Sequence, residues 1–283
     1  MATTQTFDVF NPEVWGAKLN RAFEANLVAA KFFSNYSNDV AGRGDKLWIP
    51  AISNGFTCTA VNTTSGDIAN TALSDTKTAL TIDRWLADAF VMSDFQKATV
   101  GPQYRLQEEY INKMGYDLAK KLDTDLLALA SGITKGLGDS ATNLTSTVLE
   151  QAIAFMESSS INVHTDCAFI FHPNAYWKEV MGSDKLVNAS KYGRVILPTA
   201  PHNELYGIPV YISPNVPAGT AGTEGGHRNL LIHKNAIVYA VEKDGVTLHE
   251  KESESLRTKY IADTMYGKVL LNAGSGVRLI SNY

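Results

Sequence analysis

The sequence is poor in the residues that build covalent cross-links, metal centres and membrane spans. Only two of its 283 residues are cysteine, Cys58 and Cys167, and neither lies in a Cys-x-x-Cys spacing. These counts exclude a disulfide framework and a zinc ribbon, and two isolated thiols fit a reducing compartment. No hydrophobic stretch approaches the length of a membrane-spanning helix, and no basic segment followed by an apolar run opens the chain. We therefore expect a product of the cytoplasm.

Positive charge is also in short supply. The chain has 25 lysines and arginines against 29 aspartates and glutamates, which gives a formal net charge of -4. Proteins that hold nucleic acid through its phosphates carry a basic excess. Any contact with DNA is expected to be weak and non-specific.

The motifs of common enzymes are missing as well. There is no GxSxG elbow, no GxxxxGK[ST] phosphate loop and no HExxH pair. His227 and His233 would meet only across a turn, and two unrelated histidines are the simpler interpretation. No catalytic, cofactor-binding or metal site is expected. One enzyme alternative stays open, a hydrolase with a histidine-centred site within residues 164–233.

An amphipathic helix is predicted near the N-terminus. Asn11 can cap it and Pro12 suits its first position. Large apolar side chains then recur at helical spacing, at Trp15, Leu19, Phe23 and Leu27. Such a helix must lie on something, either its own core or a neighbouring molecule.

A long hairpin is predicted to follow. Residues 46–52 read as a short strand, with Pro50 at a sheet edge, and residues 78–93 read as a second strand. Between them, residues 53–78 are mostly small and polar, so this stretch buries little surface on its own. An isolated two-stranded arm is marginal in water, so the hairpin implies an external support.

The strongest local prediction is one long helix from about residue 102 to 130. It is followed by a mixed region, which ends in strands. Shorter elements are expected at 143–158 (helix), 167–171, 208–212, 230–232, 236–241, 246–249, 260–271 and 277–280 (strands), with a turn at 243–245. The class is therefore α+β.

Several stretches carry a resemblance to a known family. They are Gly42 to Ile52, Asp94 to Ala130, Leu205-Tyr206-Gly207-Ile208-Pro209-Val210 with Ser213 to Pro217, and Thr258 to Leu271 with Gly276-Val277. In this order and spacing, the chain resembles the major capsid proteins of tailed bacteriophages, whose fold encapsulin shells share. The resemblance covers nearly the whole chain.

The resemblance implies the phage capsid fold, with an N-terminal arm, an extended β-hairpin loop, a long spine helix, and peripheral and axial domains. Its implied divisions are 1–43 for the arm, 44–90 for the loop, 91–140 with 241–283 for the peripheral domain, and 141–240 for the axial domain.

The implied function is structural and not enzymatic. Many copies would assemble into pentamers and hexamers of an icosahedral head around double-stranded DNA, in the host cytoplasm, and remain in the virion. A portal and a scaffolding protein are expected partners. The scaffolding protein is expected to be a separate chain, because Met1 lies only ten residues before the first helix cap. Lys77 lies in the loop, but no motif marks an asparagine partner, so an isopeptide cross-link is not predicted.

Six aromatic residues are candidate anchors of contacts between subunits. They are Trp15, Phe23 and Phe33 on the arm, and Trp48, Phe56 and Trp85 on the loop. Packing inside one subunit is the alternative for each, and for Trp85 the two are equally favoured. Two further functions stay open, an encapsulin-like compartment shell and, less favoured because of the long helix, a head-decoration or adhesion module.

Overall fold

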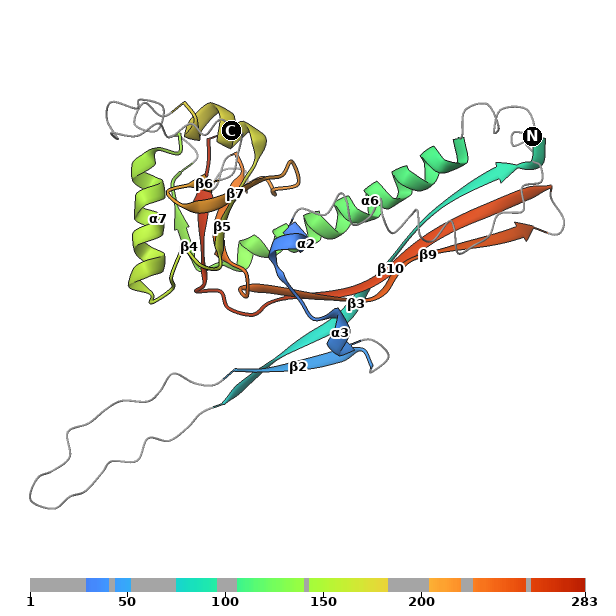
Figure 1. The fold of residues 1–283 in the computed structure, drawn as a ribbon, viewed down its shortest axis with the longest axis horizontal. Helices are drawn as coiled ribbons and strands as arrows, with labels where there is room; N and C mark the ends of the chain where they lie inside the picture. Colours follow the sequence, from blue (N-terminus) through green and yellow to red (C-terminus); the bar gives the residue numbers. More distant parts are fainter. Residues whose placement is uncertain are drawn as a thin grey trace, which may run out of the picture.

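The fold consists of two β-sheets connected by one long helix (Figure 1). The computed structural model describes residues 29–40, 44–51, 75–95, 106–139, 143–182, 204–219, 226–252 and 256–282. At 106–109 and 243–252 it describes the backbone alone.

The first sheet has five strands in the order β1-β9-β10-β3-β2. Their bounds are β1 Ser34–Asn35, β2 Lys46–Ala51, β3 Thr76–Ser93, β9 Ile237–Glu252 and β10 Arg257–Leu270. β2 runs antiparallel to β3, from Lys46 opposite Thr81 to Ala51 opposite Thr76, which confirms the predicted hairpin. Pro50 lies on the edge strand, where its missing N–H leaves no ladder position unfilled.

The turn predicted at residues 243–245 is wrong. β9 continues through this point as one strand paired with β10, and the register shifts there instead. Asp263 lies opposite Val246 and Met265 opposite Lys243, so β9 carries an extra residue, as in a β-bulge. The turn-forming sequence Asp244-Gly245 is accommodated as a bulge because β10 supplies hydrogen-bonding partners on both sides of it.

The second sheet has six strands in the order β4-β11-β8-β5-β7-β6. Their bounds are β4 Lys135–Leu137, β5 Cys167–Phe171, β6 Glu204–Leu205, β7 Ile208–Ile212, β8 Arg228–His233 and β11 Gly276–Ile280. All five residues of β5 are buried, as expected for a central strand of continuous apolar sequence. Helix α7 (Ser146–Ser158) lies beside this sheet in Figure 1, and a short π-helical segment, η2 (Ala175–Val180), follows β5.

The long helix is α6 (Leu106–Ala128), continued by a 3-10 turn, η1 (Leu129–Gly132). It is about 35 Å long, and its buried side chains Ile111, Met114, Leu118, Leu122 and Leu126 follow helical spacing. Short helix α2 (Ala29–Phe32) contacts α6, and short helix α3 (Ser37–Val40) contacts β9 and β2 of the first sheet.

The C-terminal half of α6 lies at the junction of the two sheets. One apolar cluster contains Leu126 of α6, Ile232 of the second sheet and Tyr266 of the first. The connection from β10 to β11 closes this junction, because the Leu271 N–H donates to the Ala236 carbonyl beside it. Both sheets are therefore packed on the same helix.

Candidate functional site

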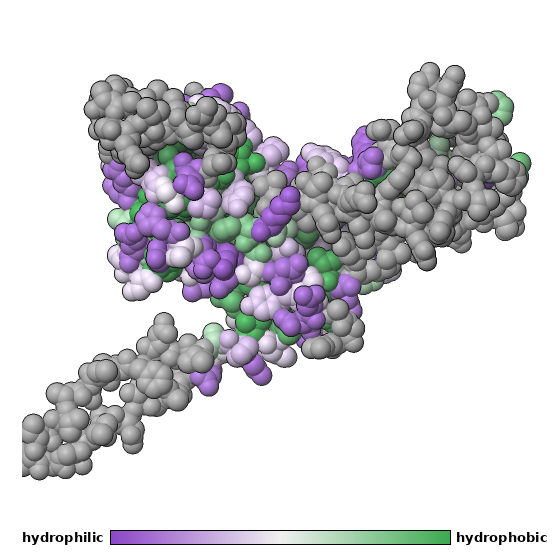
Figure 2. Space-filling model, in the orientation of Figure 1, coloured by the Kyte–Doolittle hydropathy of each residue, from purple (hydrophilic) through white to green (hydrophobic). Residues whose placement is uncertain are grey.

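Large apolar side chains remain exposed at several places on the subunit. They are Trp48, Trp85, Val91, Phe95, Tyr110, Tyr116, Trp177 and Leu256. In the space-filling view, hydrophilic residues cover much of the described surface, and the hydrophobic areas between them are small (Figure 2). Exposed apolar residues that are contiguous mark candidate interaction surfaces, whereas single ones are ordinary on soluble proteins.

Trp85 on β3 is exposed and also held in place. Its side chain is 69% exposed, yet the indole N–H donates to Oδ2 of Asp263 at 2.9 Å. Asp263 lies on β10 and is only 4% exposed. The ring therefore projects into solvent with its orientation fixed by a buried carboxylate.

Trp48 on β2 is the second exposed tryptophan of the hairpin, with 54% of its surface exposed. The ammonium of Lys77 lies 4.5 Å from the centre of its ring, which is a cation–π contact between paired strands. The next residue, Ile49, faces inward and packs with Leu80 and Val238. Alternation along β2 thus buries Ile49 and leaves Trp48 outside.

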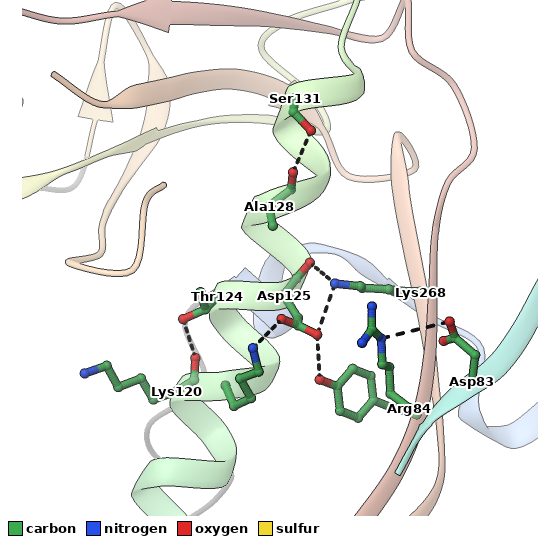
Figure 3. A network of polar contacts seen from close by, with 10 residues as sticks. Asp83, Arg84, Lys120, Thr124, Asp125, Ala128, Ser131 and Lys268 are labelled. Atoms are coloured by element: carbon green, nitrogen blue, oxygen red, sulfur yellow. Dashed lines mark hydrogen bonds and ion pairs between the residues drawn. The ribbon is translucent and has the colours of Figure 1, made fainter. Parts of the chain in front are cut away.

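A buried carboxylate, Asp125, connects the long helix to the first sheet (Figure 3). Its Oδ2 accepts from the Tyr266 hydroxyl at 3.0 Å and pairs with the Lys268 ammonium at 3.2 Å. Lys121, one turn earlier on the helix, pairs with Oδ1 at 3.1 Å. Burial opposes the ionisation of Asp125, but hydrogen bonds from Lys121 and Lys268, the charge of Lys268 and the Tyr266 hydroxyl together lower its pKa.

The lowered pKa of Asp125 predicts how stability depends on pH. The folded state favours the ionised carboxylate, so its contribution is present above the unfolded pKa, about 4, and is lost as the pH falls through the folded pKa. We expect Asp125→Asn to lower the free energy of unfolding by about 2 kcal/mol at pH 7 and by less below pH 4. Urea denaturation of both proteins between pH 7 and pH 3 measures this difference in the free energy of unfolding. A difference that does not change with pH would contradict the prediction.

Asp123, two residues earlier, ties together three other parts of the subunit. Its Oδ1 accepts from the backbone N–H of Ala29 at 2.6 Å, at the start of α2. Its Oδ2 accepts from the Ser213 hydroxyl at 3.0 Å and the Asn215 amide at 2.7 Å, beyond β7. Because residues two apart on a helix point to different sides, Asp123 holds α2 and the second sheet while Asp125 holds the first.

Two histidines of the second sheet region are stacked, with ring centres 3.5 Å apart. They are His172 and His227, a pair that no spacing in the sequence indicated. His172 Nδ1 accepts from the Asn174 N–H at 3.2 Å. Burial, and then the neighbouring His227, lower the pKa of His172 to about 4.

This stacked pair should make the fold sensitive to acid. An imidazole with a lowered pKa is neutral in the folded state, so the unfolded chain binds the proton first as the pH falls from 6.5 to 4, and stability is lost over that window. His172→Asn keeps an acceptor for the Asn174 N–H without titrating. Wild type should lose on the order of 1 kcal/mol more than this variant between pH 7 and pH 4.5, allowing for solvent screening. If wild type and His172→Asn lose the same free energy of unfolding between pH 7 and pH 4.5, the stacked pair is not the cause of the acid sensitivity.

The described residues offer little for catalysis. Within them, no three histidine, cysteine, aspartate or glutamate side chains come together in a way that could hold a metal ion. The Cys167 thiol is buried, and burial and the nearby Asp166 raise its pKa to about 11, which disfavours the reactive thiolate. In the described ranges, no helix is long and apolar enough to cross a membrane.

The sequence matches a family model described as phage capsid protein over residues 74–257, well over half of the chain. The chain belongs to the phage capsid protein family. It is therefore a structural capsid subunit of a bacteriophage, and the resemblance seen in the sequence is confirmed. No curated protein matches the sequence.

Solved capsid structures share the fold of this capsid subunit. The Mycobacterium phage Che8 chain has a TM-score of 0.71 at 16% identity, with 89% of this chain and 90% of that chain covered. The capsid of cyanophage P-SCSP1u has a TM-score of 0.68 at 15% identity, over 90% and 88% of the two chains. A virus-like particle from Pyrococcus furiosus has a TM-score of 0.60 at 11% identity, over 94% and 98%.

The six predicted anchors of this capsid subunit have different surroundings. Trp15, Phe23 and Phe56 lie outside the described residues. Phe33 is 3% exposed and belongs to the apolar cluster around α6, beside Phe32 at a ring distance of 5.5 Å. Its surface is therefore buried inside its own subunit and leaves little area for a contact with a neighbour.

Sequence reasoning missed several exposed or positioning residues. Phe95 and Leu256 lie near each other at the far end of the first sheet, where the Asp94 N–H donates to the Leu256 carbonyl. Asp263, which orients Trp85, is separated from it by 178 residues. Only a predicted pairing of β3 with β10 could have indicated that contact.

Proposed function

We propose that this capsid subunit assembles into pentamers and hexamers, and that these close an icosahedral head around double-stranded DNA. The observation that supports this most is the family match together with the open edge of the first sheet. β2 is the edge strand of the first sheet and carries the exposed Trp48, so this edge is open to a partner. Contacts between copies would cover such exposed positions, and repeated heterologous contacts close into rings.

We also propose for this chain the domain divisions that the family resemblance implies. We assign residues 1–43 to the arm, 44–90 to the extended loop, 91–140 with 241–283 to the peripheral domain, and 141–240 to the axial domain. In this assignment α6, β10 and most of β9 belong to the peripheral domain, while β2 and most of β3 belong to the loop. Most of the second sheet forms the axial domain that points to the symmetry axes. β11 and β4 would then be the strands that connect the two.

Five aromatic residues remain proposed anchors of subunit contacts. They are Trp15, Phe23, Trp48, Phe56 and Trp85. Exposure and fixed orientation support Trp48 and Trp85, since both rings have a polar partner that limits their movement. Each contact can be modest because every subunit makes many of them.

The DNA would be held by confinement and not by affinity, since the chain has a net charge of -4. We further propose a separate scaffolding protein and a portal as partners, assembly in the host cytoplasm, and no catalytic role. Salt-sensitive, tight binding of purified subunits to DNA would count against confinement.

Size-exclusion chromatography with negative-stain electron microscopy of the purified chain tests the proposal. Closed shells, ring-shaped capsomers or polyheads are the expected result. A uniform monomer or dimer, even with scaffolding protein present, would overturn it.

A compartment shell with an enzyme cargo is less well supported. The Pyrococcus particle shares the fold at a TM-score of 0.60, below the 0.71 of the Che8 chain, and the family match is to phage capsids. The contents of purified particles separate the two functions, because a phage head holds DNA and a compartment holds protein.

A further inference from the structure

The outward face of β3 is apolar where the strand passes Trp85. Side chains alternate along a strand, and here the inward positions Leu86 and Phe90 pack against the cluster around α6. The four outward positions between residues 85 and 91 are all exposed and all apolar: Trp85, Ala87, Ala89 and Val91. A strand face meant for water would carry polar residues at these positions.

The neighbouring strand β10 extends this face. Directly opposed residues in antiparallel strands point to the same side, and Met265 lies opposite Trp85 while Ile261 lies opposite Ala89. Both are partly exposed apolar residues. We call the set Trp85, Ala87, Ala89, Val91, Ile261 and Met265 the outer face.

Two charged residues of β10 lie on the same side, Lys259 opposite Val91 and Asp263 opposite Ala87, and Asp263 holds the tryptophan. The Asp263 carboxylate accepts the indole N–H of Trp85 at 2.9 Å. The carboxylate is nearly buried while the ring is mostly exposed. A large aromatic ring with a fixed orientation loses little conformational freedom on binding, which is the property of a contact anchor.

We propose that the outer face binds a second copy of this chain in the shell, with Trp85 as the anchor and Asp263 as the residue that positions it. This inference rests on the proposed function and adds the surface, its partner and a positioning residue. The outer face is smaller than a complete stable interface, so it forms one part of the many contacts each subunit makes.

The surrounding charges favour a protein partner. Asp83 and Asp263 carry negative charge near the outer face, and Arg84 and Lys259 carry positive charge, so the region has no basic excess for DNA. Trp48 is not part of the outer face. β3 carries an extra residue between Ile82 and Arg84, so Ala79, which is opposite Trp48, points to the other side of the sheet from Trp85.

Substitutions at two positions test this contact. Trp85→Ala should raise the subunit concentration needed for shell formation at least tenfold, because it removes the anchor. Asp263→Leu should raise it several-fold, while Asp263→Asn keeps an acceptor for the indole N–H and should remain within twofold of wild type. Arg84→Ala is the matched control. Arg84 is exposed and adjacent to Trp85, but its side chain points to the other face of β3, so this variant should also remain within twofold of wild type.

A spectroscopic readout separates positioning from general stability. In unassembled subunits, the Trp85 indole N–H should exchange slowly with solvent in wild type and Asp263→Asn, and faster in Asp263→Leu. Equal exchange rates in all three would overturn the role of Asp263.

Oxidative footprinting of wild type needs no variant and covers the case in which Trp85→Ala does not fold. Trp85 should be oxidised in free subunits and protected in shells. If wild type forms shells while Trp85→Ala forms them at the same concentration, or if Trp85 is oxidised equally in both states, this contact is wrong and the proposed function stands. If wild type remains a monomer or dimer even with scaffolding protein present, the proposed function fails and this contact fails with it.

Discussion

Asp123→Ala is expected to lower the free energy of unfolding by about 3–5 kcal/mol. The carboxylate is fully buried, and it accepts hydrogen bonds from Ala29, Ser213 and Asn215. Alanine would leave these three donors without their acceptor, and each buried donor left unsatisfied costs about 1–3 kcal/mol. Urea denaturation of unassembled subunits measures the loss.

The same substitution should also loosen the segment that begins at Ala29. Amide hydrogen exchange across residues 29–40 should become faster relative to the core of the second sheet, because the anchor at the start of α2 is gone. Asp117→Ala is the matched control, an exposed aspartate on the same helix, and should change stability by about 0.5 kcal/mol or less. A loss below 1 kcal/mol for Asp123→Ala would show that water replaces the three hydrogen bonds.

Gly267→Ala is expected to cost about 3 kcal/mol through a collision between two strands. Gly267 lies on β10 at its last pairing with β3, opposite Ile82, where the register shifts. A Cβ atom there would lie 2.2 Å from the carbonyl oxygen of Thr81. Because that atom belongs to the backbone of a paired strand, it cannot rotate away, and the strands must separate.

Gly136→Ala provides the comparison, because Gly136 is also in a strand but its nearest neighbour would be the Arg278 guanidinium at 3.5 Å. That distance is ordinary contact with a flexible side chain. Thermal unfolding should show a lower midpoint for Gly267→Ala and almost no change for Gly136→Ala. Equal midpoints would mean that β10 and β3 can move apart at little cost.

The elements with a strong local pattern could be predicted from the sequence. The long helix has apolar residues at helical spacing over many turns, and α6 follows the prediction from Leu106 onward. The hairpin was predicted because β2 and β3 combine strand residues with a polar stretch between them. In both cases the signal lies within a short window of the chain.

Features that depend on distant partners could not be predicted in the same way. The turn at 243–245 is a bulge because β10 pairs with both flanks of it, and no local pattern contains that information. Phe33 is in the core because it packs near the long helix, about 90 residues away in sequence. Asp123 and Asp125 look like ordinary helix-surface carboxylates until their partners on other elements are known.

The candidate contact surface was predicted in part. Trp48 and Trp85 were recognised as large aromatics on a hairpin with little support, and both are exposed. The outer face around Trp85 could not be recognised, since two of its six residues come from β10 and its positioning residue lies 178 residues away. Strand order and register were needed to bring these residues together.

Cryo-electron microscopy of particles formed by the purified wild-type chain is the most direct test of the central claim, that this subunit builds an icosahedral shell. The account predicts closed particles with fivefold vertices, in which the second sheet lies nearest the symmetry axes and the β2–β3 hairpin crosses onto a neighbouring subunit. Subunits that remain monomeric or dimeric even with scaffolding protein present, or closed particles without icosahedral symmetry, would contradict it.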